Sequence, residues 1–484
     1  MTDAPLKLFN SLTRSLEPFE PIHPGEARVY TCGPTVYNYQ HIGNMRAYVF
    51  ADTLGRTLSW KGYALKHVIN ITDVGHLTSD ADAGDDKMEK AAAREGKSAW
   101  DIARYYQQVF EADLDRLNIR KPQHPRATDY VESMIAWARS IEVKHCYELD
   151  SGLYFDVATV PEYGRLARAV TDAIEDAGEG RIDEVEGKHN AADFAIWRKT
   201  PPGETRQMEW DSPWGKGAPG WHLECSVMSA ELLGHPFDIH TGGIDHREIH
   251  HPNEIAQNQA HNCSSDSGAR IWMHNNFLID RRGKMSKSSG EFLTLQALVD
   301  RGFHPLAYRL LCLQAHYRSE LEFTWEGLEA ALTRLKRIVG AYSKIRSADV
   351  PKDFQETSLG KIFESEYSVF TSAISDDLAT PKALTAFEEL LTSKHWKAHE
   401  KAPVLLKMDR VLGFGLATLT RADLRIRPAT AEIIEAEIEA ALSERKEARA
   451  AKDFARSDAI RDDLAAKGVE VMDGDPLGWE WKLS

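Results

Sequence analysis

Hydrophobic and polar positions near the start of the chain predict a strand, a helix and a second strand in succession. The segment "ARVYTCGPTVY" (27–37) has the pattern of a short strand that runs into a Gly-Pro turn. The segment "NMRAYVFADTLGRTLSWKG" (44–62) places apolar residues at helical spacing. The next run, "YALKHVINITDVG" (63–75), is rich in β-branched residues, as strands are. This order is the building unit of a parallel sheet, so the sequence predicts an α/β fold.

The parallel-sheet pattern is interrupted and then resumes. Helical patterns at about 86–119 and 128–142 lead to "CYELDSGLYFDV" (146–157), where Asp-Ser-Gly between two alternating runs predicts a hairpin. Strand-like runs return at 236–243 and 271–279. We therefore expect a Rossmann-like sheet that an insertion divides into two halves.

The later part of the chain is mainly helical. After about residue 290 amphipathic helical segments predominate, and the tail is charged and helical until "VEVMDGDPLGWEWKL", which predicts a small β element. We therefore expect three domains: 1–345, a helical bundle at 346–425, and a small C-terminal domain at 426–484. Within the first domain, we expect the two sheet halves at about 20–140 and 205–290, the insertion at about 140–205, and a connecting helical region at about 290–345.

Composition restricts the setting in which the chain works. The 484 residues suggest several domains, and no apolar run approaches the roughly 20 residues that a membrane span needs. The N-terminus has no basic stretch followed by an apolar core, so no secretory signal is evident. Five scattered cysteines without a CxxC pair indicate a reducing, cytoplasmic setting. The net charge of −15 disfavours indiscriminate RNA binding but allows a local basic surface.

One short segment, "IHHPNEIAQ" (249–257), contains residues that can bind a metal. His250 and Glu254 are four apart and share a face of any helix that Pro252 opens. A structural zinc needs four ligands and a catalytic zinc needs three, so further ligands must come from elsewhere. Histidines near a helix start also serve commonly as capping residues, and spacing alone does not choose between His250 and His251.

Two segments near predicted strand ends are candidates for nucleotide binding. "QHIGNMR" places His41 and Asn44 where a helix opens, a position suited to phosphate oxygens, although a plain turn has the same residues. "HTGGIDH" (240–246) follows a strand. There Gly242 and Gly243 permit close backbone approach and Asp245 could accept ribose hydroxyls, while a glycine turn is the alternative.

Basic residues stand out in two further segments. "GKMSKSSG" (283–290) carries Lys284 and Lys287 in a Gly/Ser frame, from which both ammonium groups can reach a polyphosphate; a solvated basic loop is the alternative. In the tail, four basic residues at i, i+4, i+7 and i+11 form a stripe if the helix is continuous: Arg445, Arg449, Lys452 and Arg456. If Asp453 caps a second helix, the stripe is broken.

Taken together, these segments resemble the class I aminoacyl-tRNA synthetases. From "YTCGPTVYNYQHIGN" through "GWHLECSVMSAELLG" and "HHPNEIAQ" to the closing hairpin, the chain is similar to the cysteinyl-tRNA synthetase family. The Lys-Met-Ser-Lys-Ser motif matches fully at 284–288, whereas Asn44 replaces the second histidine of the first motif. Asparagine still donates a hydrogen bond, so we expect weakened or shifted phosphate contact rather than lost activity.

The resemblance implies ATP-dependent ligation of L-cysteine to tRNA(Cys) through cysteinyl adenylate, with release of pyrophosphate and AMP. It implies a monomer with one Zn²⁺ per subunit and Mg²⁺ bound with ATP. By resemblance, the zinc ligands are Cys32, Cys225, His250 and Glu254, and the catalytic residues are His41, Asn44, Lys284 and Lys287. The four catalytic residues also bind ATP, together with Gly43, Gly242, Gly243 and Asp245. Thr35 and Trp221 are the implied substrate neighbours, and Arg449, Phe454 and Asp458 the implied tRNA contacts.

A zinc ion has a physical purpose in selecting cysteine. Serine differs by oxygen for sulfur, which a hydrophobic pocket distinguishes poorly, whereas zinc prefers a thiolate. Thr35 in a turn and Trp221 in the core have ordinary structural explanations as well. The rivals are a cysteine ligase for an amino-sugar acceptor, which would lack the domain after residue 425, and an inactive RNA-binding paralogue, which would have lost the lysines or zinc ligands.

Overall fold

The centre of the molecule is a parallel sheet, as the sequence predicts. The computed structural model describes residues 4–74, 87–167, 185–280, 283–284, 293–347 and 365–483. Four parallel strands lie in the order β10-β9-β3-β4, with β3 at Glu26–Thr31, β4 at Ala64–Ile69, β9 at Phe237–Gly243 and β10 at Ala269–Asn275. The α/β fold class is confirmed.

The two halves of the sheet meet between β3 and β9. Val29 pairs with Ile239 and Thr31 with Thr241, so strands about 210 residues apart in sequence lie side by side. Helix α1 (Ile42–Trp60) connects β3 to β4, and α6 (His250–Asn262) connects β9 to β10. The strand order therefore reverses at this pair, and the crevice at the carboxyl ends of such a pair is where open α/β sheets bind ligands.

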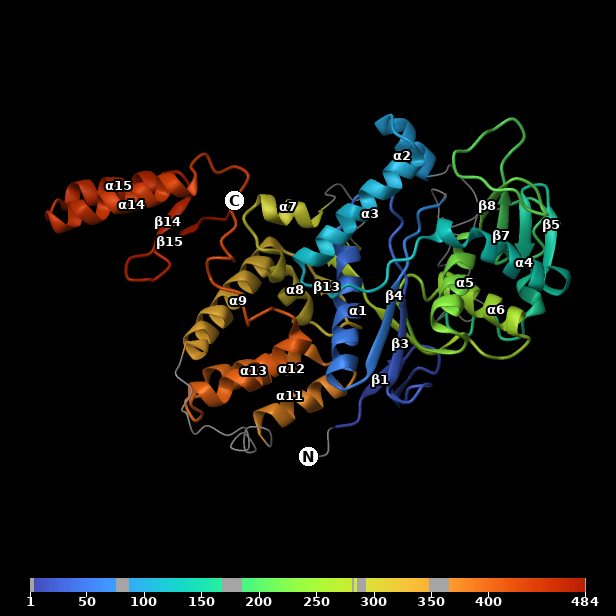
Figure 1. Cartoon of the computed structure of the whole chain (residues 1–484), viewed down its shortest axis with the longest axis horizontal. Coiled ribbons are helices and arrows are strands. Elements are labelled where there is room, and N and C mark those ends of the chain that lie inside the picture. Colours follow the sequence, from blue (N-terminus) through green and yellow to red (C-terminus); the bar gives the residue numbers. More distant parts are fainter. Residues whose placement is uncertain are drawn as a thin grey trace.

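Helices cover both faces of the sheet (Figure 1). On one face α1 packs through Phe50, Leu54 and Leu58 against Val29 and Ile239. On the other face lie α4 (Val131–His145), α5 (Trp221–Leu233) and α6. Both faces of the central strands are therefore buried, so that polar side chains of β9 such as Asp238 and His240 are enclosed in the core together with Ile239.

The remaining elements surround this core. The 86–119 region, expected as one long helical stretch, forms two helices, because Gly96 has a positive φ and Ser98 caps the second helix by accepting a hydrogen bond from the Asp101 N–H. Before the insertion lie β1 (Lys7–Asn10), β2 (Ser15–Pro18), α2 (Lys87–Glu95), α3 (Ala99–Arg116) and η1 (Ala127–Tyr130). A separate antiparallel sheet consists of β5 (Cys146–Leu149), β6 (Gly152–Phe155), β7 (Phe194–Lys199) and β8 (Gly217–Pro219), with η2 (Val157–Thr159) after β6. A three-stranded sheet of β11 (Leu278–Asp280), β12 (Gly283–Lys284) and β13 (Leu321–Glu322) and the helices α7 (Leu295–Asp300), α8 (Pro305–Leu313), α9 (Trp325–Arg346), α11 (Glu366–Ser375), α12 (Thr380–Thr392) and α13 (Ala398–Leu412) follow.

A buried ion network fixes α1 to the helical region. Asp52 of α1 forms ion pairs with Arg309 of α8 at 2.7 Å and with Arg56 at 2.6 Å. Arg309 is fully buried and also donates to the carbonyl of Leu412 at the end of α13. Burial raises the pKa of Asp52, but the two guanidinium groups outweigh that effect and hold the pKa below its usual value.

The C-terminal part has a core of its own and lies at one end of the molecule (Figure 1). It consists of α14 (Glu435–Ala450), α15 (Phe454–Ala466), β14 (Val469–Val471) and β15 (Trp479–Trp481). Lys452 has a positive φ, and the Asp453 side chain caps α15 by accepting from the Arg456 N–H. The basic stripe of the tail is therefore broken, as the alternative interpretation required. Among the described helices, none combines the length and apolar character that crossing a membrane demands.

Candidate metal centre and nucleotide site

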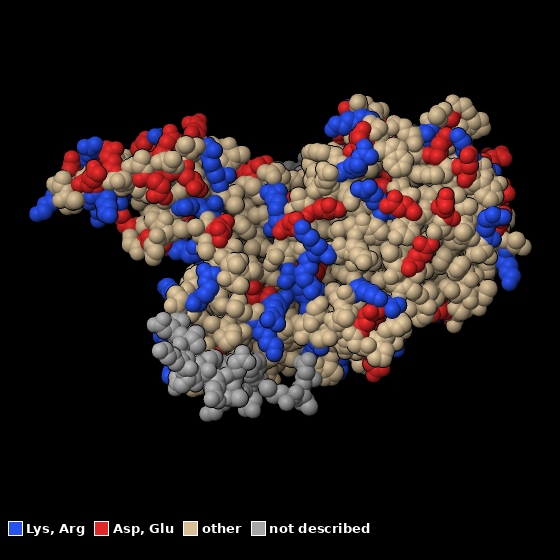
Figure 2. Space-filling view, viewed as in Figure 1, with Lys and Arg blue, Asp and Glu red and all other residues tan. Residues whose placement is uncertain are grey.

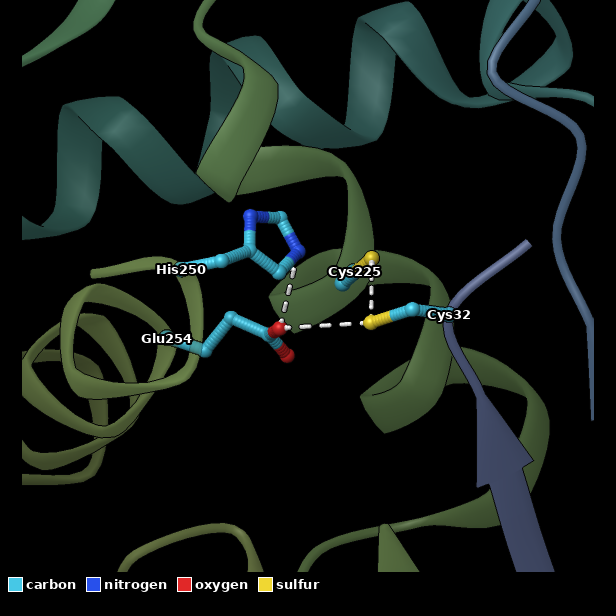
Figure 3. Close-up of side chains that lie close together, drawn as sticks. All are labelled: Cys32, Cys225, His250 and Glu254. Carbon is cyan, nitrogen blue, oxygen red and sulfur yellow. Dashed lines mark hydrogen bonds and ion pairs between the residues drawn. The ribbon is translucent and has the colours of Figure 1, made fainter. Parts of the chain in front are cut away.

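Four metal-capable side chains from three elements converge at the carboxyl end of β3 (Figure 3). Cys32 follows β3, Cys225 lies on α5, and His250 and Glu254 lie one turn apart on α6. Their ligand atoms all lie within 4.8 Å of one another, and all four residues are buried. The two halves of the sheet thus supply one site.

The distances suit a tetrahedral metal. The Sγ atoms of Cys32 and Cys225 are 4.0 Å apart, and two thiolates on one zinc at a Zn–S distance of about 2.3 Å would be roughly 3.8 Å apart. Glu254 Oε1 lies 3.9 Å from Cys32 Sγ and 3.0 Å from His250 Nε2. Two sulfurs, one imidazole and one carboxylate form a donor set that fits zinc.

The charges of these side chains stabilise one another. A hydrogen bond with Cys32 lowers the pKa of Cys225 to about 6 against the opposing effect of burial. Burial alone would lower the pKa of His250, but Glu254 and Cys225 raise it to about 10. Burial would likewise raise the pKa of Glu254, yet His240 and His250 lower it to about 2. Burial and the hydrogen bond with Cys225 raise the pKa of the Cys32 thiol well above its usual value. The anionic donors are therefore Cys225 and Glu254, and a divalent cation requires anionic donors of this kind.

A second set of donors overlaps the first. Cys32, His240, His251 and Glu254 also satisfy the spacing of a metal site. His251 Nε2 lies 3.3 Å from Cys32 Sγ, while its Nδ1 is 2.8 Å from His274 Nε2. His240 Nε2 lies 2.8 Å from Glu254 Oε2. This set offers one sulfur instead of two, so the first set suits zinc better.

A cavity of about 380 Å³ opens beside the metal-capable group. Its wall includes residues predicted from the sequence for the metal, the substrate and ATP: Cys32, His250, Thr35, Trp221, His41, Gly43, Asn44, Gly243 and Asp245. Trp221 lies against His250, with ring centroids 4.2 Å apart. Cys225 and Glu254 are buried and do not line the cavity.

Residues 18–333 match the tRNA synthetases class I (C) catalytic domain, and residues 433–476 match the cysteinyl-tRNA ligase anticodon binding domain. A cysteine–tRNA ligase of Novosphingobium aromaticivorans is 68% identical over 99% of this chain and 98% of its own length. The cysteine–tRNA ligase of Zymomonas mobilis is 53% identical over 99% of this chain and 98% of its own. This chain belongs to the cysteine–tRNA ligase family.

Solved structures of more distant synthetases share the fold of this family member. A Mycobacterium tuberculosis methionyl-tRNA synthetase in complex with methionyl-adenylate aligns with a TM-score of 0.53 at 14% identity, over 80% of this chain and 88% of its own. A ternary LeuRS-tRNA-LeuAMS complex from Agrobacterium radiobacter K84 aligns with a TM-score of 0.57 at 13% identity, over 83% and 86%. At these identities the likeness concerns the fold alone.

The predicted ATP-binding residues of this chain lie in a helix cap, a closely packed strand end and a short antiparallel strand. His41 caps α1, and its Nδ1 accepts from the Asn44 N–H at 3.1 Å, so the neutral ring carries its proton on Nε2. Gly242 has a packing reason for being glycine, because a Cβ there would lie 2.8 Å from the rings of His246 and His251. The backbone of Lys284 in β12 pairs with that of Ile279 in β11, and Lys287 lies outside the described residues.

The predicted tRNA contacts lie far from the cavity, on the C-terminal end. Phe454 is 61% exposed at the start of α15. Arg449 lies 3.3 Å from Asp473, and Asp458 lies 3.5 Å from Arg461. Basic and acidic side chains are interspersed over this region (Figure 2).

Several cavity residues were not singled out from the sequence, among them His246, Asn275 and Tyr48. His246 closes the quoted "HTGGIDH" segment, so its position after a strand was an available signal. Tyr48 is one of the apolar residues at helical spacing in the segment 44–62, and nothing local distinguishes it from a core residue.

Proposed function

We propose that the chain attaches L-cysteine to tRNA(Cys) in two steps, as a cytoplasmic monomer with zinc, and with Mg²⁺ accompanying ATP. The observation that carries this proposal is that one cavity is lined both by Cys32 and His250 of the metal-capable group and by the N-terminus of helix α1, which follows a parallel strand. The first suits a thiol, and the second suits phosphate.

The amino-acid end of the cavity is formed by Cys32, His250, Thr35 and Trp221. We propose that Cys32, Cys225, His250 and Glu254 hold zinc, which when bound selects a thiolate over a hydroxyl. The indole of Trp221 lies against His250 with the two ring planes tilted by 34° and supplies an apolar wall, and Thr35 offers a hydroxyl to the polar end of the amino acid.

The nucleotide end is formed at the start of α1 and the end of β9. The first N–H groups of α1, His41 Nε2 and the Asn44 amide would contact phosphate oxygens, while Asp245 would accept ribose hydroxyls beside Gly243. Lys284 and Lys287 are proposed to hold the β- and γ-phosphates.

The chemistry then consists of positioning and charge stabilisation. The cysteine carboxylate attacks the α-phosphorus of ATP, which forms cysteinyl adenylate and releases pyrophosphate. His41, Asn44 and the two lysines stabilise the charge that grows on the phosphates. The terminal ribose hydroxyl of the tRNA next attacks the activated carbonyl, which gives cysteinyl-tRNA and AMP.

We propose a separate role for each of the expected domains. Residues 1–345 would carry the adenylate chemistry, 346–425 a helical bundle, and 426–484 the anticodon contacts, with Arg449, Phe454 and Asp458 as candidates. An exposed aromatic ring at the start of α15 is suited to stacking on an unpaired base.

Pyrophosphate exchange with the purified chain tests the proposal. Exchange should depend on cysteine, should be far weaker with serine, and should not require tRNA. Added tRNA(Cys) should become charged, while an amino-sugar acceptor should not consume the adenylate. Exchange without charging of tRNA would favour the sugar-ligase rival, and absence of exchange would favour an RNA-binding paralogue.

A further inference from the structure

One side chain in the wall of the cavity has a hydrogen-bond acceptor without a partner. Asn275, the last residue of β10, lines the cavity and is only 4% exposed. Its Oδ1 atom is buried, and no donor in the described part of the chain makes a hydrogen bond to it. Buried polar groups are ordinarily hydrogen-bonded, because removing one from water without a partner destabilises the folded state. The Oδ1 atom therefore requires an explanation.

The orientation of the Asn275 amide is fixed by its other end. The Nδ2 group donates to the carbonyl oxygen of Asn276 at 3.1 Å. The buried guanidinium of Arg46 donates to the same carbonyl at 3.0 Å, which holds that oxygen in place. Turning the amide over would set Oδ1 against the carbonyl oxygen, and neither atom could donate. The atom of Asn275 that is left for a ligand is therefore an acceptor.

The face of the sheet places Asn275 at the nucleotide end of the cavity. Ile271 and Met273 of β10 belong to the core cluster that packs against α1. His274 lies on the opposite face, where its Nε2 is 2.8 Å from Nδ1 of His251 on α6. Since side chains alternate along a strand, Asn275 is on the face of α1. The metal-capable group is on the other face, with α5 and α6.

The backbone around Asn275 joins it to the proposed ribose site. Asn275 is the register partner of Gly243 at the end of β9, and its carbonyl accepts the Ile244 N–H at 2.8 Å. Asp245, the proposed ribose acceptor, is the next residue along and lines the same cavity. Phosphate oxygens are acceptors and cannot satisfy another acceptor. The nucleoside part of ATP, in contrast, has donors in its ribose hydroxyls and in the 6-amino group of adenine.

We propose that Asn275 is a nucleoside-binding residue, whose Oδ1 accepts a hydrogen bond from an O–H or N–H donor on the nucleoside of ATP. The inference rests on the proposed function and adds to it a residue that selects the nucleotide. A buried group that is built to pair with a substrate donor rejects an analogue without that donor, because the group is then left unpaired. Asn275 would therefore discriminate against nucleotides that lack the matching donor.

The test combines a change in the protein with a change in the nucleotide. Cysteine-dependent pyrophosphate exchange is measured with ATP and with 2′-deoxy-ATP, 3′-deoxy-ATP and purine riboside triphosphate, each of which lacks one donor. The full-length variants are Asn275→Ala and Asn275→Ser. The matched control is Asn258→Ala on α6, because Asn258 is also buried with an Oδ1 that has no partner in the described part of the chain, but does not line the cavity. The penalty of an analogue is the ratio of kcat/KM for ATP to kcat/KM for the analogue in one protein, so an inactive fraction cancels.

Both Asn275 variants should lower kcat/KM for ATP by about tenfold and leave the KM for cysteine unchanged. One analogue should have a penalty about tenfold smaller in these variants than in the wild type, because they have no bond left to lose. A deoxy-ATP in that role identifies a ribose hydroxyl, and purine riboside triphosphate identifies the 6-amino group. Asn258→Ala should keep the wild-type penalties. Penalties that are equal in the wild type and the Asn275 variants for all three analogues overturn the role of Asn275. Absence of wild-type exchange with ATP would instead overturn the proposed function.

Discussion

The two overlapping donor sets can be separated by changing one histidine at a time. His250 belongs to the set with two sulfurs, and His251 to the set with one. Replacing each by glutamine preserves most of the side-chain volume but removes the imidazole. If zinc occupies the first set, His250→Gln removes a ligand, whereas His251→Gln removes a neighbour that contacts Cys32 Sγ at 3.3 Å.

The expected losses of zinc affinity differ by about one order of magnitude. Four protein ligands bind structural zinc with about 10–16 kcal/mol, so each contributes roughly 2.5–4 kcal/mol, or about a 100- to 1,000-fold change in dissociation constant. Loss of a neighbour that only orients a ligand costs about 10- to 100-fold. His250→Gln should therefore weaken zinc binding clearly more than His251→Gln does.

A chelator competition at fixed pH measures both affinities, and cobalt absorption reports the number of sulfurs. Cys225→Ser should remove roughly half of the thiolate-to-cobalt absorption in the first set and none in the second. Added cysteine should strengthen the band of the wild type, and serine should leave it unchanged. The first set is refuted if His251→Gln causes the larger loss and Cys225→Ser leaves the band intact.

Four further outcomes are expected. Lys287→Ala should slow pyrophosphate exchange much more than it raises the KM for cysteine, because its charge acts as pyrophosphate leaves; unchanged exchange would make the lysine a solvated loop residue. Deletion after residue 425 should spare cysteine-dependent exchange while greatly impairing tRNA charging, and equal charging by the shortened chain would remove the anticodon assignment. Burial lowers the pKa of His67 from 6.5 to about 4, so below pH 6.5 the unfolded chain takes up a proton that the folded chain does not. Stability should therefore fall on acidification by about 2.5 kcal/mol at pH 4.5, and His67→Gln should lose that part of the pH dependence in urea titrations. Asp52→Ala should destabilise the chain by about 3–5 kcal/mol in the same titrations because it leaves Arg309 buried without a counter-charge, and a loss under 1 kcal/mol would contradict this.

Short-range sequence patterns were sufficient to predict the strands of the parallel sheet, but they were not sufficient to predict where the helices break. Strands β3, β4, β9 and β10 could be predicted because each is a short β-branched or apolar run that ends at turn residues. The break between α14 and α15 could be stated only as an alternative, because Asp453 fits a helix cap and also fits a charged helix surface. Whether Asp453 caps a second helix or continues the first depends on the packing of α14 against α15, and a short stretch of sequence does not contain that information.

Only part of the metal-capable group could be predicted from residue spacing, because the rest depends on tertiary structure. The i, i+4 spacing of His250 and Glu254 could be predicted to share a helix face, and they do lie on α6. Cys32 and Cys225 are 193 residues apart, so only pairing of β3 with β9 and packing of α5 could join them to that face. The family resemblance provided this grouping before the fold was known. Neither spacing nor resemblance pointed to His240, since a buried polar residue in a strand looks like an ordinary core position.

The segment between Cys32 and α1 explains how the proposed thiol-selecting end and the proposed phosphate-binding end can share one cavity. Gly33 donates its N–H to Asn70 Oδ1, and a Cβ at that position would lie 1.5 Å from the Asn70 carbonyl oxygen, so no other residue fits there without moving the backbone. Val36 and Thr72 pair across the same loop, and the Ile42 N–H bonds to the Leu293 carbonyl where α1 begins. This loop joins Cys32 of the metal-capable group to the start of α1, where we propose that phosphate binds. On the proposed assignment, a change at Asn44 would alter the contact with phosphate without displacing Cys32, so an asparagine at this position would be compatible with thiol selection.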